Sequence, residues 1–512
     1  MRCPAFLSPA NNCASRRAFV LRLLLCAAAG ALNVLAFEPF GLYPLPLLTL
    51  GVLVACLRGE TRARRAFALG FAWGWTDFVV GVGWLGIALH RFGGMWLPFT
   101  VLAVSLFCAW LALFPALASA VFVRLQGNQL PGARAALLFG SCWALGEWLR
   151  GTVFTGFPWL AIGYSQATGH GALDGWFALI GAYGVGALVA ALAAACVHLR
   201  ARFAALAIAA VCAAGLAAGK VEWTQPDGAP LEVSLLQPNV EQSLKWDPDL
   251  FFAWLDRFIE LAYQHPARLI VLPESALPVF EDQLTDSIRN RLRMSALGQT
   301  LLVGVFLRNE QQHAFNSAIT YGEGEGQRYG KHHLVPFGEY SPPLFGWFYQ
   351  LIHIPMSDQT PAPARQAPIR IGTHRIALNI CYENLFGHEI ARNALDAGIL
   401  LNLSNLSWYG SDSLAQAQHL QIGRARALET ARPYLSGSND GMTAALDPHG
   451  RTLAALAPAT MGALTLPVQA TTGQTPYLHL RDWPALATAL ALLILCPGTA
   501  HLRRLFRRGN AA

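Results

Sequence analysis

Apolar residues are gathered into long runs over two parts of the chain, and this pattern predicts membrane helices. A helix that crosses a bilayer needs about 20 mostly apolar residues. Runs near that length lie at residues 18–36, 44–57, 66–89, 95–123, 135–149, 174–198, 203–219 and 484–501. We therefore expect about eight transmembrane helices. About seven form an N-terminal bundle over residues 1–221, and one belongs to a C-terminal segment, residues 483–512, that ends in a basic tail.

Residues 222–482 carry a different pattern, in which short apolar runs alternate with amphipathic stretches. The apolar runs are typical of β-strands and lie at 231–237, 268–275, 300–306, 314–322, 374–380 and 399–405, with a strand–turn–strand at 436–451. Helical patterns lie at 249–263, 282–296, 383–398 and 413–431. Near-continuous apolar strands indicate a sheet that is covered on both faces. This part is expected to form a separate α/β layered domain.

The composition agrees with a membrane protein. The chain has 512 residues, of which 54% are hydrophobic and 13% charged, and its formal net charge is +7. Soluble domains carry about 25% charged residues. Much of the positive charge lies in arginines beside the apolar runs, close to where lipid headgroups would be. The charge therefore gives no indication of nucleic acid binding.

The arginines also predict how the chain crosses the membrane, because short cytoplasmic loops retain basic residues. They precede the first run and follow the second, fourth, sixth and last, at Arg16, Arg17, Arg58, Arg62, Arg64, Arg65, Arg124, Arg134, Arg200, Arg202, Arg503, Arg504, Arg507 and Arg508. With eight spans, both termini are expected in the cytoplasm and the α/β domain on the other side, the periplasm in a bacterium with two membranes. Residues 1–36 also fit a cleaved signal peptide, but the runs that follow at once favour a retained helix.

Cysteine placement singles out one residue of the α/β domain. The chain has ten cysteines, and all except Cys381 lie in the apolar runs or near the amino terminus. The domain therefore has neither a disulfide framework nor the Cys/His spacing of a zinc site. Two interpretations of Cys381 stay open at this point: a small buried core residue at the end of a strand, or a reactive thiol.

Three chemical groups stand at or just past predicted strand ends, where ligands gather in α/β folds. Glu274 closes "LIVLPE", Lys331 follows a strand and a Gly-rich turn, and Cys381 closes "IALNIC". A carboxylate beside a thiol can act as general base, and an ammonium can stabilise a thiolate or an oxyanion. Each residue alone has a simpler explanation, since such a Glu is often a salt-bridge partner and such a Lys is usually solvated.

Taken together, the motifs resemble a known family. "LPESALP" around Glu274, "KHHLVPFGEY" from Lys331 and "NICYENLF" around Cys381 are similar to the Glu-Lys-Cys triad motifs of the nitrilase superfamily. With a bundle in front and an anchor behind, the chain resembles the apolipoprotein N-acyltransferases of bacterial inner membranes. The resemblance implies an αββα sandwich. It also implies transfer of a fatty acyl chain from a bilayer phospholipid to the α-amino group of a lipoprotein's N-terminal diacylglyceryl-cysteine, without a metal or soluble cofactor.

The resemblance assigns catalytic roles to three residues. Cys381 would be the nucleophile that carries the acyl group as a thioester in a ping-pong cycle, and Glu274 would be the proton acceptor. Lys331 would stabilise the oxyanion, helped by the backbone N–H of Tyr382.

Five further matches are supporting or substrate-binding residues: Glu339, Tyr382, Glu383, Trp246 and Asn316. Glu339 would position Lys331, or it forms a structural salt bridge. Glu383 matches the family's Cys-Tyr-Glu run, but a first-turn acid that stabilises a helix dipole explains it almost as well. Trp246 would lie on a loop near the site or would serve packing, and Asn316 would orient a site group.

Two segments are candidates for lipid contact. The stretch between Glu339 and Asp358 is dense in aromatic and aliphatic residues, so it would dip into the membrane interface, close over acyl chains or be buried in the domain core. Residues 154–166 would contribute to a lipid entrance from the bundle. A membrane-anchored nitrilase-type amidase is the alternative function, although it gives little reason for these segments. A binding or transport protein gives no reason for the three catalytic groups.

Overall fold

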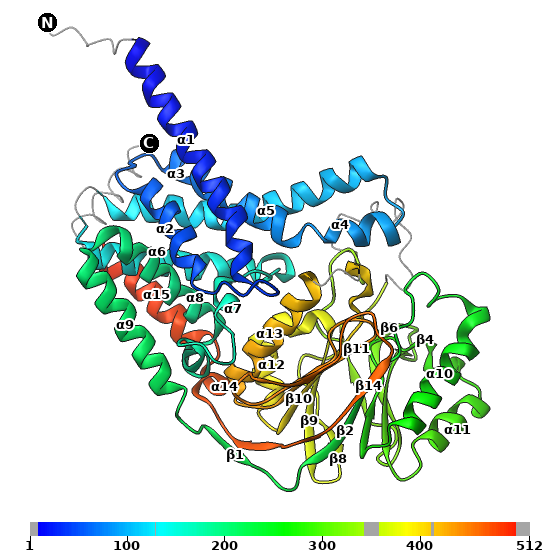
Figure 1. The fold of residues 1–512 in the computed structure, drawn as a ribbon. Helices are drawn as coiled ribbons and strands as arrows, with labels where there is room; N and C mark the ends of the chain where they lie inside the picture. Colours follow the sequence, from blue (N-terminus) through cyan, green and yellow to red (C-terminus); the bar gives the residue numbers. More distant parts are fainter. Residues whose placement is uncertain (1–8, 128–129, 342–357, 411–413, 498–512) are drawn as a thin grey trace, which may run out of the picture.

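The computed structural model describes residues 9–127, 130–341, 358–410 and 414–497. A helical bundle occupies one side of the molecule and an α/β domain the other (Figure 1). The long helices are α1 Pro9–Asn33, α2 Leu45–Leu57, α3 Ala63–Val82, α5 Leu97–Gln126, α6 Gly132–Arg150, α8 Asp174–His198, α9 Ala201–Ala218 and α15 Trp483–Leu495. Short helical pieces between them are η1 Val34–Ala36, α4 Leu85–Ile87, η2 Ala88–Phe92, η3 Val153–Thr155 and α7 Ile162–Ser165. Each predicted apolar run overlaps one of the long helices.

Not every long helix is suited to cross a bilayer alone. Among the described residues, length and hydropathy select Arg16–Ala36, Leu97–Gln126, Asp174–His198 and Ala201–Ala218. A further pair, Ala63–Val82 with Leu85–Phe92, is bent by 57°, and α2 and α15 are shorter apolar helices. The predicted count of eight spans is therefore not established.

Two predicted runs are broken rather than continuous. The run at 66–89 ends as a helix at Val82, and the indole N–H of Trp84 then donates to the Gly81 carbonyl at 2.9 Å. Helix α8 is interrupted at Gly181, whose φ of 64° and ψ of −178° are not helical. A Cβ at Gly181 would lie 2.2 Å from the Tyr477 ring, so only glycine fits this break.

The α/β domain is built on two large sheets. In the described residues one sheet has the order β14 Gly462–Val468, β2 Leu231–Gln237, β3 Leu269–Val271, β5 Thr300–Arg308, β6 Ala314–Gly322 and β7 Arg328–Gly330, with β4 Leu277–Phe280 paired to β5. The other has the order β13 Thr452–Ala455, β12 Ala444–Leu446, β11 Tyr434–Ser438, β10 Ile399–Ser404, β9 His374–Ile380 and β8 Ile369–Ile371. A small pair, β1 Thr224–Pro226 and β15 Thr471–Gly473, lies where the domain joins the bundle.

The core between the sheets is apolar, and helices cover the outer faces. Val233 and Val271 of one sheet belong to the same buried cluster as Leu378 and Leu401 of the other. Helices α10 Phe251–Gln264 and α11 Asp286–Ser295 cover the first sheet, and α12 Gly387–Ala394 and α13 Leu414–Thr430 cover the second. The remaining helical pieces are η4 Pro248–Leu250, η5 Glu281–Gln283, η7 Cys381–Leu385, η8 Leu406–Tyr409 and α14 Pro476–Leu480. The predicted αββα sandwich is confirmed.

Helix α13 lies between its sheet and the bundle, and nearly all of its residues are buried. Polar side chains at this junction form hydrogen bonds across it. Glu429 accepts from the Ala182 N–H at 2.9 Å, directly after the break in α8, and the Trp159 indole donates to the Gln418 amide oxygen at 2.7 Å. The Tyr164 hydroxyl donates to the Leu385 carbonyl at 2.9 Å. The α/β domain is therefore attached to the bundle by specific polar contacts as well as by apolar packing.

Candidate active site

Cys381 follows strand β9 at a sharp bend in the backbone. Its φ is 51°, in the left-handed region that non-glycine residues rarely adopt, and its side chain is buried. Two side chains hold its carbonyl, because His419 Nε2 donates at 3.1 Å and Asn402 Nδ2 donates at 3.3 Å. Burial lowers the pKa of His419 to about 4, so the ring is neutral and its one N–H lies on Nε2. A strained turn after a strand is where α/β enzymes often place a nucleophile.

Glu274 comes from the turn after β3, and three groups hold its carboxylate. One oxygen accepts from Asn316 Nδ2 at 2.8 Å and from the Lys331 ammonium at 3.2 Å. The other accepts from the backbone N–H of Asn405 at 2.9 Å. With both oxygens engaged, the carboxylate has a fixed orientation, which a general base requires.

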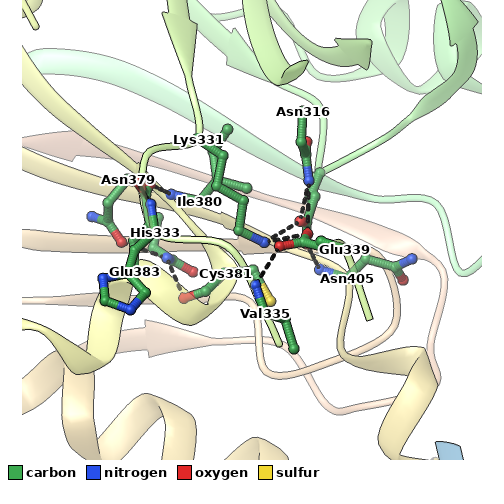
Figure 2. Close-up of polar contacts among 12 residues, drawn as sticks. Asn316, Lys331, His333, Val335, Glu339, Asn379, Ile380, Cys381, Glu383 and Asn405 are labelled. Atoms are coloured by element: carbon green, nitrogen blue, oxygen red, sulfur yellow. Dashed lines mark hydrogen bonds and ion pairs between the residues drawn. The ribbon is translucent and has the colours of Figure 1, made fainter. Parts of the chain in front are cut away.

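Lys331 follows β7 and lies between two carboxylates. Its ammonium is 2.6 Å from Glu339 and 3.2 Å from Glu274, and the residue is only 1% exposed (Figure 2). Burial lowers the pKa of Lys331, but the charges of Glu274 and Glu339 outweigh it and hold the pKa well above its ordinary value. The lysine is therefore a permanent cation at the site.

The thiol of Cys381 shares this electrostatic environment. Burial raises its pKa, the Glu274 carboxylate raises it further, and Lys331 lowers it, with the net result well above the ordinary value. The resting thiol is neutral at physiological pH. Its proton must pass to a base as the sulfur attacks, and Glu274 is the carboxylate with the strongest effect on the pKa of the thiol.

Glu339 and Asn316 complete this arrangement. Glu339 accepts from Lys331 and from Asn316 at 3.3 Å through one oxygen, and from the Val335 N–H at 2.8 Å through the other (Figure 2). Asn316 thus donates to both carboxylates that flank Lys331. The predicted supporting residue Glu339 lies where it holds Lys331. Asn316, predicted as a substrate-binding residue, orients the two carboxylates.

Glu383 accepts from three backbone N–H groups and the Tyr329 hydroxyl, not from the thiol. One oxygen accepts from Ile380 N–H at 2.6 Å and from the Tyr329 hydroxyl at 3.0 Å. The other accepts from the backbone N–H groups of His332 at 2.7 Å and His333 at 3.2 Å. Glu383 does lie in the first turn of a short helix, as the dipole interpretation predicted. Its contacts also tie the Cys381 turn to the segment after Lys331, which the sequence did not indicate.

Tyr382 and Trp246 lie at the edges of the site. The Tyr382 hydroxyl donates to the Gly156 carbonyl of the bundle at 2.7 Å, so the end of this side chain is bonded to the bundle. Trp246 is half-buried, with its ring 6.0 Å from Phe306. The roles of the Tyr382 backbone N–H in oxyanion binding and of Trp246 in substrate binding stay predictions.

Of the two predicted lipid-contact segments, only the one in the bundle lies wholly within the described residues. The stretch between Glu339 and Asp358 lies mostly outside the described residues, since residues 342–357 are not among them. Residues 154–166 lie against the turn at Cys381, where the ring centroids of Phe157 and Tyr382 are 6.3 Å apart. The Phe154 side chain in the same segment is 80% exposed.

Lys245 and Asn405 also contact Glu274, and the sequence did not predict either contact. The Lys245 ammonium is buried and donates to the Glu274 carbonyl at 3.2 Å, and burial lowers the pKa of Lys245 to about 8. A single lysine in "SLKWDPD", shortly before two aspartates, is typical of a solvated side chain, so the sequence did not indicate that it is buried. Asn405 acts on Glu274 through its backbone, which no side-chain pattern reveals.

The fold and the site define the class of the α/β domain. Residues 232–477 match the family described as carbon-nitrogen hydrolase, and residues 29–195 match the apolipoprotein N-acyltransferase N-terminal domain. Three apolipoprotein N-acyltransferases are each 40% identical to the chain. The one from Nitrosomonas europaea aligns over 490 residues (93% of this chain, 97% of the relative), that from Ralstonia nicotianae over 493 (94% and 93%) and that from Chromobacterium violaceum over 499 (95% and 96%). The chain belongs to the apolipoprotein N-acyltransferase family and is a membrane protein.

Proposed function

We propose that the chain transfers a fatty acyl group from a membrane phospholipid to the N-terminal α-amino group of a lipoprotein's diacylglyceryl-cysteine. The observation that carries this proposal is the meeting of Glu274, Lys331 and Cys381 in a domain that is joined to a membrane bundle. Membership of the family supports the choice of lipoprotein as acceptor and of a lipid as donor. The donor, the acceptor and the catalytic roles of the three residues are parts of the proposal.

In the first half of the cycle, Cys381 takes the acyl group. The thiol proton passes to Glu274 while the sulfur attacks the ester carbonyl carbon, and the carbonyl oxygen becomes an oxyanion that Lys331 stabilises. The C–O bond to the glycerol then breaks, and the leaving oxygen takes the proton from Glu274. The products are a lysophospholipid and a thioester on Cys381.

In the second half, the acceptor amine takes the acyl group. Its nitrogen attacks the thioester carbonyl carbon and loses a proton to Glu274, and Lys331 again stabilises the oxyanion. When the C–S bond breaks, the thiolate takes the proton from Glu274 and the neutral thiol returns. Because donor product leaves before the acceptor reacts, the cycle is ping-pong.

The loops that meet the α/β domain support the proposed orientation in the membrane. The loop after α1 contacts it, with Glu38 N–H donating to Gln421 at 3.1 Å, and the loop after α6 does so through Gly156. The basic ends of the helices lie together elsewhere, where Arg58 donates to the Val197 carbonyl at 3.2 Å. The positive-inside rule then supports a periplasmic catalytic domain at the inner membrane, with both termini cytoplasmic. The proposed domains are the bundle (1–221), the catalytic domain (222–482) and the C-terminal segment (483–512).

Trapping the acyl-enzyme tests the proposal. Purified protein in detergent micelles is mixed with a phospholipid of defined chain length and no acceptor, and its intact mass is measured. We expect an increase of one acyl group that hydroxylamine removes and that a diacylglyceryl lipopeptide discharges. Cys381→Ala should show no increase while still inserting into membranes.

Retention of acyl transfer in Cys381→Ala would refute the mechanism. The amidase alternative predicts another outcome, in which the protein releases ammonia from small amides and leaves the lipopeptide amine unmodified. The same micelle preparation serves both assays, so the two functions are compared on one sample.

A further inference from the structure

Side chains form hydrogen bonds to three successive backbone carbonyls of the loop between α6 and α7. His333 Nε2 contacts the Thr155 carbonyl at 2.9 Å, the Tyr382 hydroxyl donates to Gly156 at 2.7 Å, and Arg150 donates to Phe157 at 2.7 Å. The loop is also strained, because Phe154 has φ 51° and Thr155 has φ 76°. Side chains from outside the loop therefore hold a conformation that its own residues do not favour.

Two of these contacts come from the segments that carry the catalytic groups. Tyr382 directly follows Cys381, and His333 lies two residues after Lys331. Glu383 joins the same segments, since it accepts from the backbone N–H groups of Ile380 and His333. The bundle loop and the two catalytic segments thus form one connected unit.

The His333 ring faces an acceptor at each nitrogen. Nδ1 lies 3.1 Å from the Glu389 carboxylate, and Nε2 faces the Thr155 carbonyl. A carbonyl can only accept, so Nε2 carries a proton, and an ionised carboxylate requires a second proton on Nδ1. Burial raises the pKa of Glu389, but the neighbouring histidines outweigh it and lower the pKa, so the carboxylate is ionised at neutral pH. Both contacts are satisfied by the imidazolium form.

The other groups around the ring are consistent with a cation. The ring stacks on Phe386 with centroids 3.5 Å apart and planes inclined by 15°, an arrangement that favours positive charge. The charged or titratable groups around the ring include Glu389, His388 and Arg392 of α12, Tyr382 and Glu383 of η7, and His332 beside it in the chain. Burial lowers the pKa of His388, so it adds no competing charge, although it lies within 4 Å of both Glu389 and Asp482.

We propose that His333 is a positioning residue that, as an imidazolium, fastens the bundle loop to the segments bearing Cys381 and Lys331. Loss of its charge weakens the contact with Glu389 or Thr155, the strained loop relaxes, and Tyr382 no longer holds the Cys381 turn. The effect on catalysis rests on the proposed acyl transfer, whereas the attachment of the loop through His333 does not. His333 touches no reacting atom in this scheme.

The test compares wild type with His333→Gln and Glu389→Gln, and uses His313→Gln as a control on the exposed β5–β6 turn. The first variant removes the cation, and the second removes the carboxylate that favours it while keeping the imidazole. We expect His333→Gln to form the acyl-enzyme about tenfold more slowly than wild type, the cost of about one charged hydrogen bond. Glu389→Gln should be slowed less, because its imidazole can still donate to the Thr155 carbonyl.

Hydrogen exchange of the peptide covering residues 152–160, corrected for intrinsic rates, gives a second readout without catalysis. The loop should be protected in wild type, lose protection in both variants and keep the wild-type profile in His313→Gln. Equal rates of acyl-enzyme formation in wild type and His333→Gln, or unchanged loop exchange in both variants, would overturn the proposal. A wild type that forms no acyl-enzyme, together with loop exchange that still increases in the two variants, would refute the proposed function and support the positioning role of His333.

Discussion

The hydroxyl of Tyr382 and the carbonyl of Gly156 are joined by a 2.7 Å hydrogen bond between the α/β domain and the bundle. The two residues are 226 positions apart in the chain, and Tyr382 directly follows Cys381. The position of the thiol is therefore coupled to the membrane half of the molecule. Removing this bond should affect catalysis without altering any charged group of the site.

Tyr382→Phe tests that coupling. The variant keeps the ring packing against Phe157 and Phe386 but leaves the buried Gly156 carbonyl without its donor, at a cost of about 1–3 kcal/mol. We expect slower acyl-enzyme formation and a lower thermal unfolding temperature in micelles. Tyr263→Phe is the control, because that tyrosine is 57% exposed on α10. Equal rates in wild type and Tyr382→Phe would show that the bond does not position the thiol.

Glu274→Gln should have opposite effects on transfer and on thiol acidity. Transfer should be lost, since the base is removed. The carboxylate raises the pKa of Cys381 while Lys331 lowers it, so the variant's pKa should fall toward the ordinary value. Alkylation of Cys381 by iodoacetamide, followed by peptide mass spectrometry, should therefore begin at lower pH than in wild type. Glu310→Gln, on an exposed turn, is the control and should be alkylated as wild type is. An unchanged alkylation profile in Glu274→Gln would contradict the effect of Glu274 on the pKa of Cys381.

Lys245→Met should stabilise the protein at neutral pH. The folded pKa of Lys245, about 8, is below the ordinary 10.5, so the unfolded chain binds more protons between these values. Wild-type stability is then lowest below pH 8 and rises as pH climbs toward 10.5. The gap corresponds to about 3 kcal/mol, and loss of the bond to Glu274 offsets about 1 kcal/mol of it.

Thermal unfolding in micelles across this pH range is the measurement. The advantage of Lys245→Met over wild type should be largest below pH 8 and should disappear near pH 10.5. Lys220→Met, at an exposed position, should show no such trend. A difference that grew with pH would mean that Lys245 is stabilised as a cation.

Gly304→Ala should displace the general base. A Cβ at Gly304 would lie 2.2 Å from the Pro273 carbonyl oxygen and 2.9 Å from the Glu274 Cα, both backbone atoms. The turn must move, and displacements of that kind cost about 10²-fold in rate. We expect a lower kcat for acyl-enzyme formation with little change in KM for the phospholipid. Gly462→Ala, where the nearest atom is 4.0 Å away, should behave as wild type.

The sequence predicted those parts of the fold that depend on local pattern. Strands β2, β6 and β9 have the predicted bounds, because their apolar runs are flanked by polar or turn residues. The predicted helix at 383–398 is instead divided between η7 and α12, since Phe386 adopts φ −103° and ψ 81°. The break of α8 at Gly181 was also missed, because one glycine in an apolar run does not reveal the Tyr477 ring that requires it.

The site was predictable as residues but not as a network. Glu274, Lys331 and Cys381 were recognised by their motifs, and the structure brings their side chains together. The left-handed turn at Cys381 and the backbone donors from Asn405 and Val335 depend on tertiary packing, which leaves no mark on side-chain identity. Glu383 shows the same limit, because its partners His332 and His333 are about 50 residues away and donate through the backbone.

Helix α13 determines whether the α/β domain can be separated from the bundle. One of its faces covers a sheet of the α/β domain, and the other meets the bundle with Gln418 and Glu429 bonded to bundle residues. Detaching residues 222–482 from the helices would expose this second face and leave those polar groups to water. The α/β domain is thus not expected to work when it is separated from the bundle. Membrane extraction that loosens the bundle should inactivate the enzyme before the sheets of the α/β domain unfold.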